Sequence, residues 1–223
     1  VVTGDLAAPE ALRAAVRDAD AVLHLAGAVR GATRADFDAA NVDGSAALLA
    51  AMDAAAPRAR LLFFSSLAAR EPALSHYAAS KRRAEQLLRS RAAARPVTIL
   101  RPPAVYGPGD REMLPVVRFI ARTGRARFAG RAADRLSLIF IDDLARAAQA
   151  WLDAPVAPTA TWSLHDGRAG GYDWTAMCTI VGAACGREIR AWEIPRVPLD
   201  LIARGNRALG KLLGRAPMLT PEK

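Results

Sequence analysis

Three short apolar runs, separated by helix-forming sequence, limit the fold of this chain more than any other feature. They span about 21–25, 61–65 and 97–100, and near-continuous hydrophobic runs of this length are typical of strands buried on both faces of a parallel sheet. The stretches between them are long enough for crossover helices, and one helical run extends from about 34 to 55. The alternation predicts an α/β fold in which helices cover both faces of a parallel sheet.

The composition is that of a soluble enzyme. The 223 residues are 52% hydrophobic and 24% charged, which is enough apolar sequence for a sizeable core. No stretch approaches the ~20 uninterrupted apolar residues of a membrane span, and no signal peptide is visible. We therefore expect a cytoplasmic protein without a membrane partner, built from one domain or from one domain and part of another.

The cysteines and histidines give no sign of a metal site. Cys178 and Cys185 are the two cysteines, and they form no Cys-x-x-Cys motif. His24, His76 and His165 are scattered along the chain. Neither a zinc site nor a disulfide framework is supported, so we expect no metal ion.

The formal charge of +9 raises the question of a nucleic-acid partner. Arginine supplies almost all of the positive charge, and it is spread through helical stretches between alanines. Such faces are usually only solvated, and no basic stretch is interleaved with the aromatic residues that stack on bases. The sequence therefore predicts no nucleic-acid partner.

Tyr77 and Lys81 form a pair that can carry acid/base chemistry. They lie four residues apart at the start of a helix-forming stretch, which brings a phenol and an ammonium group to the same helical face. A phenol ionises near pH ~10, and a neighbouring positive charge lowers its pKa toward the working range of a general acid or base. A surface tyrosine beside a solvated lysine has the same spacing, so only the surrounding sequence can distinguish a catalytic pair from a solvated one.

Other polar groups follow the predicted strands. The run from 61 to 64 ends in Ser65 and Ser66, at the carboxyl end of a strand, where open parallel sheets bind ligands. Asn41 lies inside the helical run from about 34 to 55, in the sequence Asn-Val-Asp-Gly. After the run from 97 to 100, the chain enters a Pro/Gly-rich turn that reaches Gly109. These separate pieces support one another.

Taken in order, these motifs resemble the extended short-chain dehydrogenase/reductases, the NAD-dependent epimerase/dehydratase family. The resemblance covers most of the chain and rests on segments 4–6, 22–27, 41–44, 65–66, 77–81, 101–107 and 140–144. It implies a Rossmann-like doubly wound parallel sheet with a smaller C-terminal substrate lobe. It also implies NAD or NADP as the cofactor.

The resemblance gives each candidate catalytic residue a role. Tyr77 would exchange the proton of a substrate hydroxyl as hydride moves to or from the nicotinamide, and Lys81 would lower the pKa of the phenol and bind the nicotinamide ribose. Ser66 would orient the substrate oxygen, because the family's hydroxyl normally occupies the second position of such a serine pair. Asn41 would support the helix and the water beside the lysine.

The resemblance also implies a set of cofactor-binding residues. Small residues let backbone approach the dinucleotide, and the fixed φ of proline suits a stiff wall beside the nicotinamide. Asp5 would approach the adenine ring. The full set is Asp5, Leu6, Leu25, Ala26, Gly27, Tyr77, Lys81, Pro102, Pro103 and Val105.

One element of the family pattern is not found between residues 1 and 223. No Gly-x-x-Gly-x-x-Gly turn occurs, so we interpret residues 1–6 as the end of the family's third strand and expect an N-terminal βαβ segment to precede them. In the strand order 3-2-1-4-5-6, that segment supplies the strands between the third and the fourth. We therefore expect residues 1–223 alone to fold poorly. The choice between NAD and NADP is normally set after the second strand, and it stays open.

The chain divides in character near Gly109. We predict a dinucleotide-binding Rossmann domain over residues 1–109, and mainly a substrate-binding lobe over 110–223 from which some segments return to the first domain. Helices are expected at about 112–123, 142–152 and 173–184, strands at 135–141, 160–164 and 188–194, and an amphipathic segment at 199–213.

Two classes of function remain. The favoured one is an NAD(P)-dependent oxidoreductase, epimerase or dehydratase that acts on a hydroxyl or carbonyl carbon of a small metabolite, a nucleotide sugar being one candidate. The link between Ser66 and Tyr77 is short for an extended member, and Glu71 stands where the family has glycine, which counts against the nucleotide sugar. The alternative is a non-catalytic dinucleotide sensor or assembly protein on the same fold. Family members often dimerise through the helices that carry the tyrosine and the asparagine, so a homodimer is compatible with the sequence.

Overall fold

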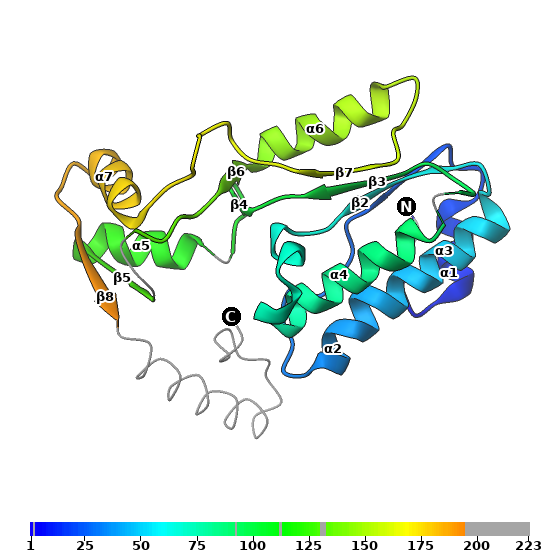
Figure 1. Ribbon diagram of the computed structural model, residues 1–223, viewed down its shortest axis with the longest axis horizontal. Helices are drawn as coiled ribbons and strands as arrows, with labels where there is room; N and C mark the ends of the chain where they lie inside the picture. The colour runs from blue at the N-terminus through cyan, green and yellow to red at the C-terminus, as the bar shows by residue number, and fades with distance from the viewer. Residues whose placement is uncertain (2, 92, 112, 130–132, 195–223) are drawn as a thin grey trace.

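The structure is a computed structural model that describes residues 1, 3–91, 93–111, 113–129 and 133–194. Its main element is a four-stranded parallel sheet in the order β1-β2-β3-β7 (Figure 1). The strands are β1 (Ala21–His24), β2 (Arg60–Phe64), β3 (Val97–Arg101) and β7 (Ala160–Ser163). The predicted α/β class and the parallel sheet are confirmed, and each of the three apolar runs forms a strand within a residue of its expected ends.

Helices cover both faces of this sheet, as Figure 1 shows. On one face lie α1 (Pro9–Val16), α3 (Gly44–Ala55) and α4 (His76–Arg89), joined by the short α2 (Arg34–Asp38). Their apolar side chains form one core cluster with alternate residues of the strands, including Leu61, Phe63 and Ile99. On the other face, α6 (Ile141–Asp153) packs Leu144, Ala148 and Trp151 against Leu62, Phe64 and Leu100.

Helix α4 begins at a clear sequence signal. Ser75 is the N-cap residue, and its hydroxyl accepts a hydrogen bond from the backbone N–H of Ala78 at 3.1 Å, which satisfies one of the free donors of the first turn. The helix then buries one face, including Lys81 and Glu85, against the sheet. Tyr77 and Lys81 therefore occupy the first two turns of a helix whose start is fixed.

The long helical run from 34 to 55 contains an irregularity that the sequence did not predict. A π-helical segment, Ala39–Asp43, separates α2 from α3. Single turns of this kind are frequent at functional sites. Asn41 lies within this segment and is almost completely buried.

The second half of the chain adds smaller elements. Strand β4 (Ala104–Tyr106) pairs with β6 (Leu138–Phe140), and β5 (Arg125–Ala129) pairs with β8 (Arg190–Ile194), both in parallel. With α5 (Leu114–Thr123) and α7 (Trp174–Cys185), β5 and β8 lie at one end of the molecule (Figure 1). The predicted strand near 160–164 joins the main sheet beside β3. The predicted amphipathic segment at 199–213 lies outside the described residues, and the two-domain division stays a prediction.

The expected strand at the start of the chain is not observed among the described residues 1 and 3–6. A strand needs a ladder partner for its backbone groups, and none pairs with this segment among the strands that the structure describes. Instead, the Asp5 carboxylate accepts the backbone N–H of Ala7, and a turn leads into α1. None of the described helices is long and apolar enough to cross a membrane.

Candidate active site

The candidate residues gather at the carboxyl edge of the main sheet. Because β1, β2 and β3 are parallel and in register, the segments that follow them leave the sheet at the same edge. These segments carry Leu25–Gly27, Ser65–Ser66 and Pro102–Pro103. Helix α4 brings Tyr77 and Lys81 to the same edge, since Lys81 bonds the last residue of β2.

Tyr77 faces the serine that follows β2. The Ser66 side chain lies close enough to the phenol to favour its ionised form, but burial outweighs this effect and raises the pKa of Tyr77. The predicted lowering of this pKa by Lys81 is therefore wrong for this structure. The ring packs edge-on against Phe37 at 6.1 Å between centroids. At neutral pH, Tyr77 therefore holds its proton.

Lys81 is an almost fully buried lysine. Its Nζ donates to the backbone carbonyl of Phe64 at 3.2 Å and lies 5.1 Å from the centre of the Phe63 ring. Burial lowers the pKa of Lys81 to about 8, while the negative charge of Glu85 acts in the opposite direction. Lys81 is therefore mainly protonated at neutral pH, so an ammonium group lies beneath the end of β2.

Asn41 connects the segment after β1 to helix α4. Its Oδ1 accepts the backbone N–H of Ala28 at 2.9 Å, and its Nδ2 donates to the Ala28 carbonyl and to the Ser80 hydroxyl at 3.0 and 2.8 Å. Ser80 in turn donates to the carbonyl of Tyr77 at 2.8 Å. Asn41 thus fixes the position of the Tyr77 helix relative to the β1 edge, a role in support of the site.

The residues after β1 fit the close approach that a dinucleotide requires. Gly27 has no room for a side chain, because a Cβ there would lie 2.5 Å from Oδ1 of Asn41 and 3.2 Å from Nζ of Lys81. Leu25 is 62% exposed beside it. Asp5, Leu6 and Ala26 line a common cavity of about 180 Å³. The predicted adenine-side residues and the segment after β1 therefore share one surface.

The predicted nicotinamide wall lies after β3. The carbonyl of the buried Pro102 accepts the backbone N–H of Leu67 at 2.8 Å, which joins this wall to the residue after Ser66. Pro103 and Val105 are half-buried, and Val105 packs against the core on the α6 side of the sheet. This bond places Pro102 at the same edge as Ser66, and the contact of these residues with a nicotinamide stays a prediction.

Sequence reasoning missed a buried ionic group next to the site. Glu85 has no exposed surface, and its Oε1 accepts the hydroxyl of Ser65 at 2.6 Å and Nε of Arg101 at 2.8 Å. The Ser65 hydroxyl is thereby engaged by Glu85, and the choice of Ser66 as the serine of the site stays a prediction. The available signal was spacing, because Tyr77, Lys81 and Glu85 follow one another at intervals of four and share one face of α4.

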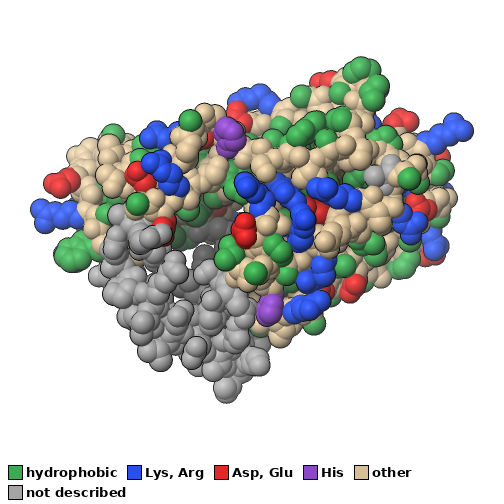
Figure 2. All heavy atoms as spheres, viewed as in Figure 1, with side chains coloured by type: hydrophobic (Ala, Val, Ile, Leu, Met, Phe, Trp, Pro, Cys, Tyr) green, Lys and Arg blue, Asp and Glu red, His purple; other side chains and the backbone are tan. Residues whose placement is uncertain are grey.

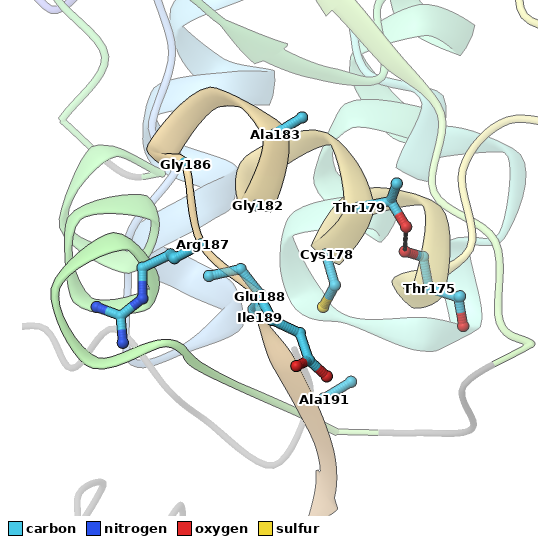
Figure 3. Close-up of a pocket in the computed structure, with 10 residues that line it drawn as sticks. All are labelled: Thr175, Cys178, Thr179, Gly182, Ala183, Gly186, Arg187, Glu188, Ile189 and Ala191. Atoms are coloured by element: carbon cyan, nitrogen blue, oxygen red, sulfur yellow. Dashed lines mark hydrogen bonds between the residues drawn. The ribbon is translucent and has the colours of Figure 1, made fainter.

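A buried histidine borders this site, and a second cavity lies in another part of the chain. His24 is buried and bonds the Ser45 hydroxyl at 2.8 Å, as expected for a core histidine. A larger cavity of about 670 Å³ lies between α7 and the chain from Gly186 to Ala191 (Figure 3), and the side chain of Cys178 points from the helix toward that chain. Within the described part of the chain, no three His, Cys, Asp or Glu side chains group in a way that could hold a metal ion.

The basic side chains do not form an uninterrupted surface on the face that Figure 2 shows. Lysine and arginine side chains occur over both parts of the molecule there, with acidic side chains among them. Several arginines form ion pairs, including Arg83 with Asp38 and Arg95 with Asp53. The expected lack of a nucleic-acid partner stays a prediction.

Comparison with known sequences connects these features to characterised proteins. The sequence profile described as the NAD dependent epimerase/dehydratase family matches residues 1–162. A ceramide reductase from Caulobacter vibrioides is 39% identical over 195 residues, which are 87% of this chain and 59% of the relative. A 2-alkyl-3-oxoalkanoate reductase from Stenotrophomonas maltophilia is 32% identical over 172 residues, 66% of this chain and 50% of the relative. The chain therefore spans little more than half the length of these curated relatives.

Solved structures agree on the fold. MoeE5 in complex with UDP-glucuronic acid and NAD superposes with a TM-score of 0.75 at 22% identity, covering 87% of this chain and 71% of that one. RMD from Pseudomonas aeruginosa, complexed with NADPH, gives 0.72 at 23% identity over 86% and 75% of the two chains. At such identities the likeness concerns architecture alone, and it confirms the predicted Rossmann-like fold.

Proposed function

The chain belongs to the NAD-dependent epimerase/dehydratase family, and from this premise we propose that it carries the acid/base site of an NAD(P)-dependent carbonyl reductase. The single observation that carries the proposal is the meeting of Tyr77 and Ser66 at the end of β2, with Lys81 one helical turn away. A purely structural tyrosine has no need of both a hydroxyl partner and a buried cation.

Each residue has a task in this reaction. A bound nicotinamide supplies the hydride that reduces the carbonyl carbon. Tyr77 donates its proton to the carbonyl oxygen as negative charge develops there, and Ser66 orients that oxygen by a hydrogen bond. The Lys81 ammonium, held at the end of β2 by the Phe64 carbonyl, would bind the nicotinamide ribose. Asn41 holds helix α4 in register with the segment after β1.

The cofactor has matching residues on this chain. Gly27 leaves its backbone open to close approach beside Asn41 and Lys81, and Asp5, Leu6 and Ala26 line a cavity that would receive the adenine. Pro102, Pro103 and Val105 would contact the nicotinamide end, next to Ser66. The proposal covers both NAD and NADP, because the residues that usually distinguish them follow the family's second strand.

The names of two relatives favour reduction of a ketone over conversion of a nucleotide sugar. The two curated relatives described above are named reductases, of ceramide and of 2-alkyl-3-oxoalkanoate. We therefore propose a ketone with an alkyl chain as the substrate class, within a protein of which the homodimeric state and cytoplasmic location also stay predictions.

The test is turnover by the full-length protein. NADH and NADPH oxidation is followed with a 3-oxo fatty acid, a simple aliphatic ketone and UDP-glucose, for the wild type and for Tyr77→Phe. We expect turnover of the 3-oxo compound and a loss of kcat of about 1000-fold in Tyr77→Phe. Tyr172→Phe is the matched control, since that phenol bonds Asp166 in a loop outside the site, and it should keep wild-type kcat.

The alternative of a non-catalytic dinucleotide sensor makes the opposite forecast. Such a protein would bind NADH or NADPH, measured by quenching of its fluorescence, without any turnover that depends on Tyr77. Tight binding with equal background oxidation in wild type and Tyr77→Phe on all three substrates would overturn the reductase proposal.

A further inference from the structure

Glu85 is a fully buried carboxylate that joins three elements next to the proposed site. From helix α4, its Oε1 accepts the Ser65 hydroxyl at the end of β2 at 2.6 Å. Arg101, at the end of β3, donates to both carboxylate oxygens, from Nε to Oε1 at 2.8 Å and from Nη2 to Oε2 at 2.5 Å. A bidentate pair of this kind fixes orientation as well as distance.

The two strand ends that Glu85 holds are those that continue into the site. Ser65 is followed by Ser66, which faces Tyr77, and Arg101 is followed by Pro102, whose carbonyl bonds the residue after Ser66. Tyr77 and Lys81 precede Glu85 on the same helical face. The distance between the phenol and the strand ends therefore depends on how α4 sits against β2 and β3, and Glu85 is a direct link between them.

Glu85 also sets the charge around Lys81. The charged groups facing Glu85 are Arg101 from β3 and, from α4, Lys81 and Arg82, whose Nη1 lies 3.7 Å from the carboxylate. Two other titratable groups lie near Lys81. His24 interacts with it electrostatically, and Tyr77 lies one helical turn before it on α4. With His24 neutral, Glu85 supplies negative charge to a region that otherwise holds buried cations.

We propose that Glu85 is a positioning residue of the reductase site, which ties the ends of β2 and β3 to the helix that carries Tyr77 and Lys81. The expected effect on kcat rests on the proposed function. The expected effect on the ionisation of Lys81 does not, because that ionisation can be measured without any substrate. The two can therefore fail separately.

The first experiment follows Lys81 by NMR. The full-length protein is labelled at the lysine side chains, and the Lys81 signal is assigned by its loss in Lys81→Arg. In the wild type, Lys81 should titrate near pH 8. In Glu85→Gln, loss of the opposite charge should lower the midpoint by about one pH unit. An unchanged midpoint in a folded Glu85→Gln protein would overturn the proposal, whatever the enzyme's substrate is.

The second experiment separates positioning from mere stability. Replacing a buried ion pair by apolar residues of similar size is often neutral for stability, so the double variant Glu85→Leu, Arg101→Met should recover a melting temperature lost in Glu85→Gln. We expect kcat for the 3-oxo compound to stay about tenfold low in both variants, with KM for the cofactor little changed and the alkaline limb of the pH profile moved to lower pH. Recovery of wild-type kcat and pH profile together with the melting temperature would show that Glu85 is only structural.

Ser65→Ala keeps the experiment decisive if Glu85→Gln fails to fold. It removes one neutral hydrogen bond to Glu85 without changing any charge. The expected result is a kcat lowered several-fold with a normal Lys81 midpoint, and a wild-type kcat would overturn the positioning role. Glu10→Gln, which breaks an exposed pair with Arg13 on α1, is the matched control and should alter none of these readouts.

Discussion

At the scale of single residues, His24 makes the folded state sensitive to acid. Burial, and to a lesser degree the charge of Lys81, lowers the pKa of His24 to about 4, whereas the ordinary value is 6.5. Between these values the unfolded chain binds a proton that the folded protein does not, so stability falls as pH falls through this window. The loss amounts to about 3 kcal/mol by the lower end.

Urea unfolding at pH 6.5 and again near pH 4 measures this effect. His24→Gln is expected to be less stable at neutral pH, because it disturbs the bond to Ser45, but to lose about 3 kcal/mol less than the wild type on acidification. His165→Gln alters an exposed ring and should follow the wild type. If the His24 variant loses stability as steeply as the wild type, then the buried histidine is not the acid-sensitive group.

At the scale of secondary-structure elements, the N-cap of α4 connects local helix physics to the site. Ser75 caps the first turn, in which Tyr77 lies. Ser75→Ala should cost about 1 kcal/mol in the free energy of unfolding. Because fraying of this turn displaces the phenol, kcat should fall as well, by several-fold.

Ser90→Ala tests the other end of the same helix. The Ser90 hydroxyl donates to the Leu87 carbonyl at 2.6 Å on the exposed surface, so its loss should cost a few tenths of a kcal/mol and leave kcat unchanged. Denaturant titrations and initial rates give both quantities. Equal losses of kcat in the two variants would mean that the site responds to general helix stability and not to the cap.

How well sequence predicts an element depends on where its stabilising contacts lie. The strands at 21–24, 60–64 and 97–101 were predicted, because each is a continuous apolar run and its own residues indicate that it is buried. The π segment around Asn41 depends on bonds to Ala28 and Ser80, which are distant in sequence. Strand β4 is short and partly exposed, and its partner β6 lies more than thirty residues away, so no local pattern marked it.

The same difference divides the site residues. Tyr77, Lys81, Ser66 and Asn41 were recognised because they occur in an ordered set of family motifs. Glu85 was missed because a glutamate among the arginines of a helix is usually part of a solvated face. Only the fold shows that this face is pressed against the strand ends.

At the scale of the whole molecule, one arginine joins the main sheet to helix α6, which comes from the second half of the chain. Arg60, at the start of β2, donates to the carbonyls of Leu152 and Ala154 at 2.5 and 2.7 Å, across more than ninety residues of sequence. These carbonyls belong to the end of α6, and the guanidinium also lies 4.8 Å from the centre of the Trp151 ring. Arg60 therefore caps α6 and holds it on the sheet.

Arg60→Ala should consequently lower the free energy of unfolding by about 2–3 kcal/mol, since it removes two charge-assisted hydrogen bonds and a cation–π contact. Arg60→Lys should recover only part of the loss, because an ammonium group cannot reproduce the planar fork that reaches both carbonyls. Arg58→Ala, two residues earlier and exposed, should cost less than about 0.5 kcal/mol. Hydrogen exchange locates the effect, with the last turn of α6 losing protection before α4 does. If Arg60→Ala weakens both helices equally, the arginine stabilises the sheet as a whole and α6 docks without it.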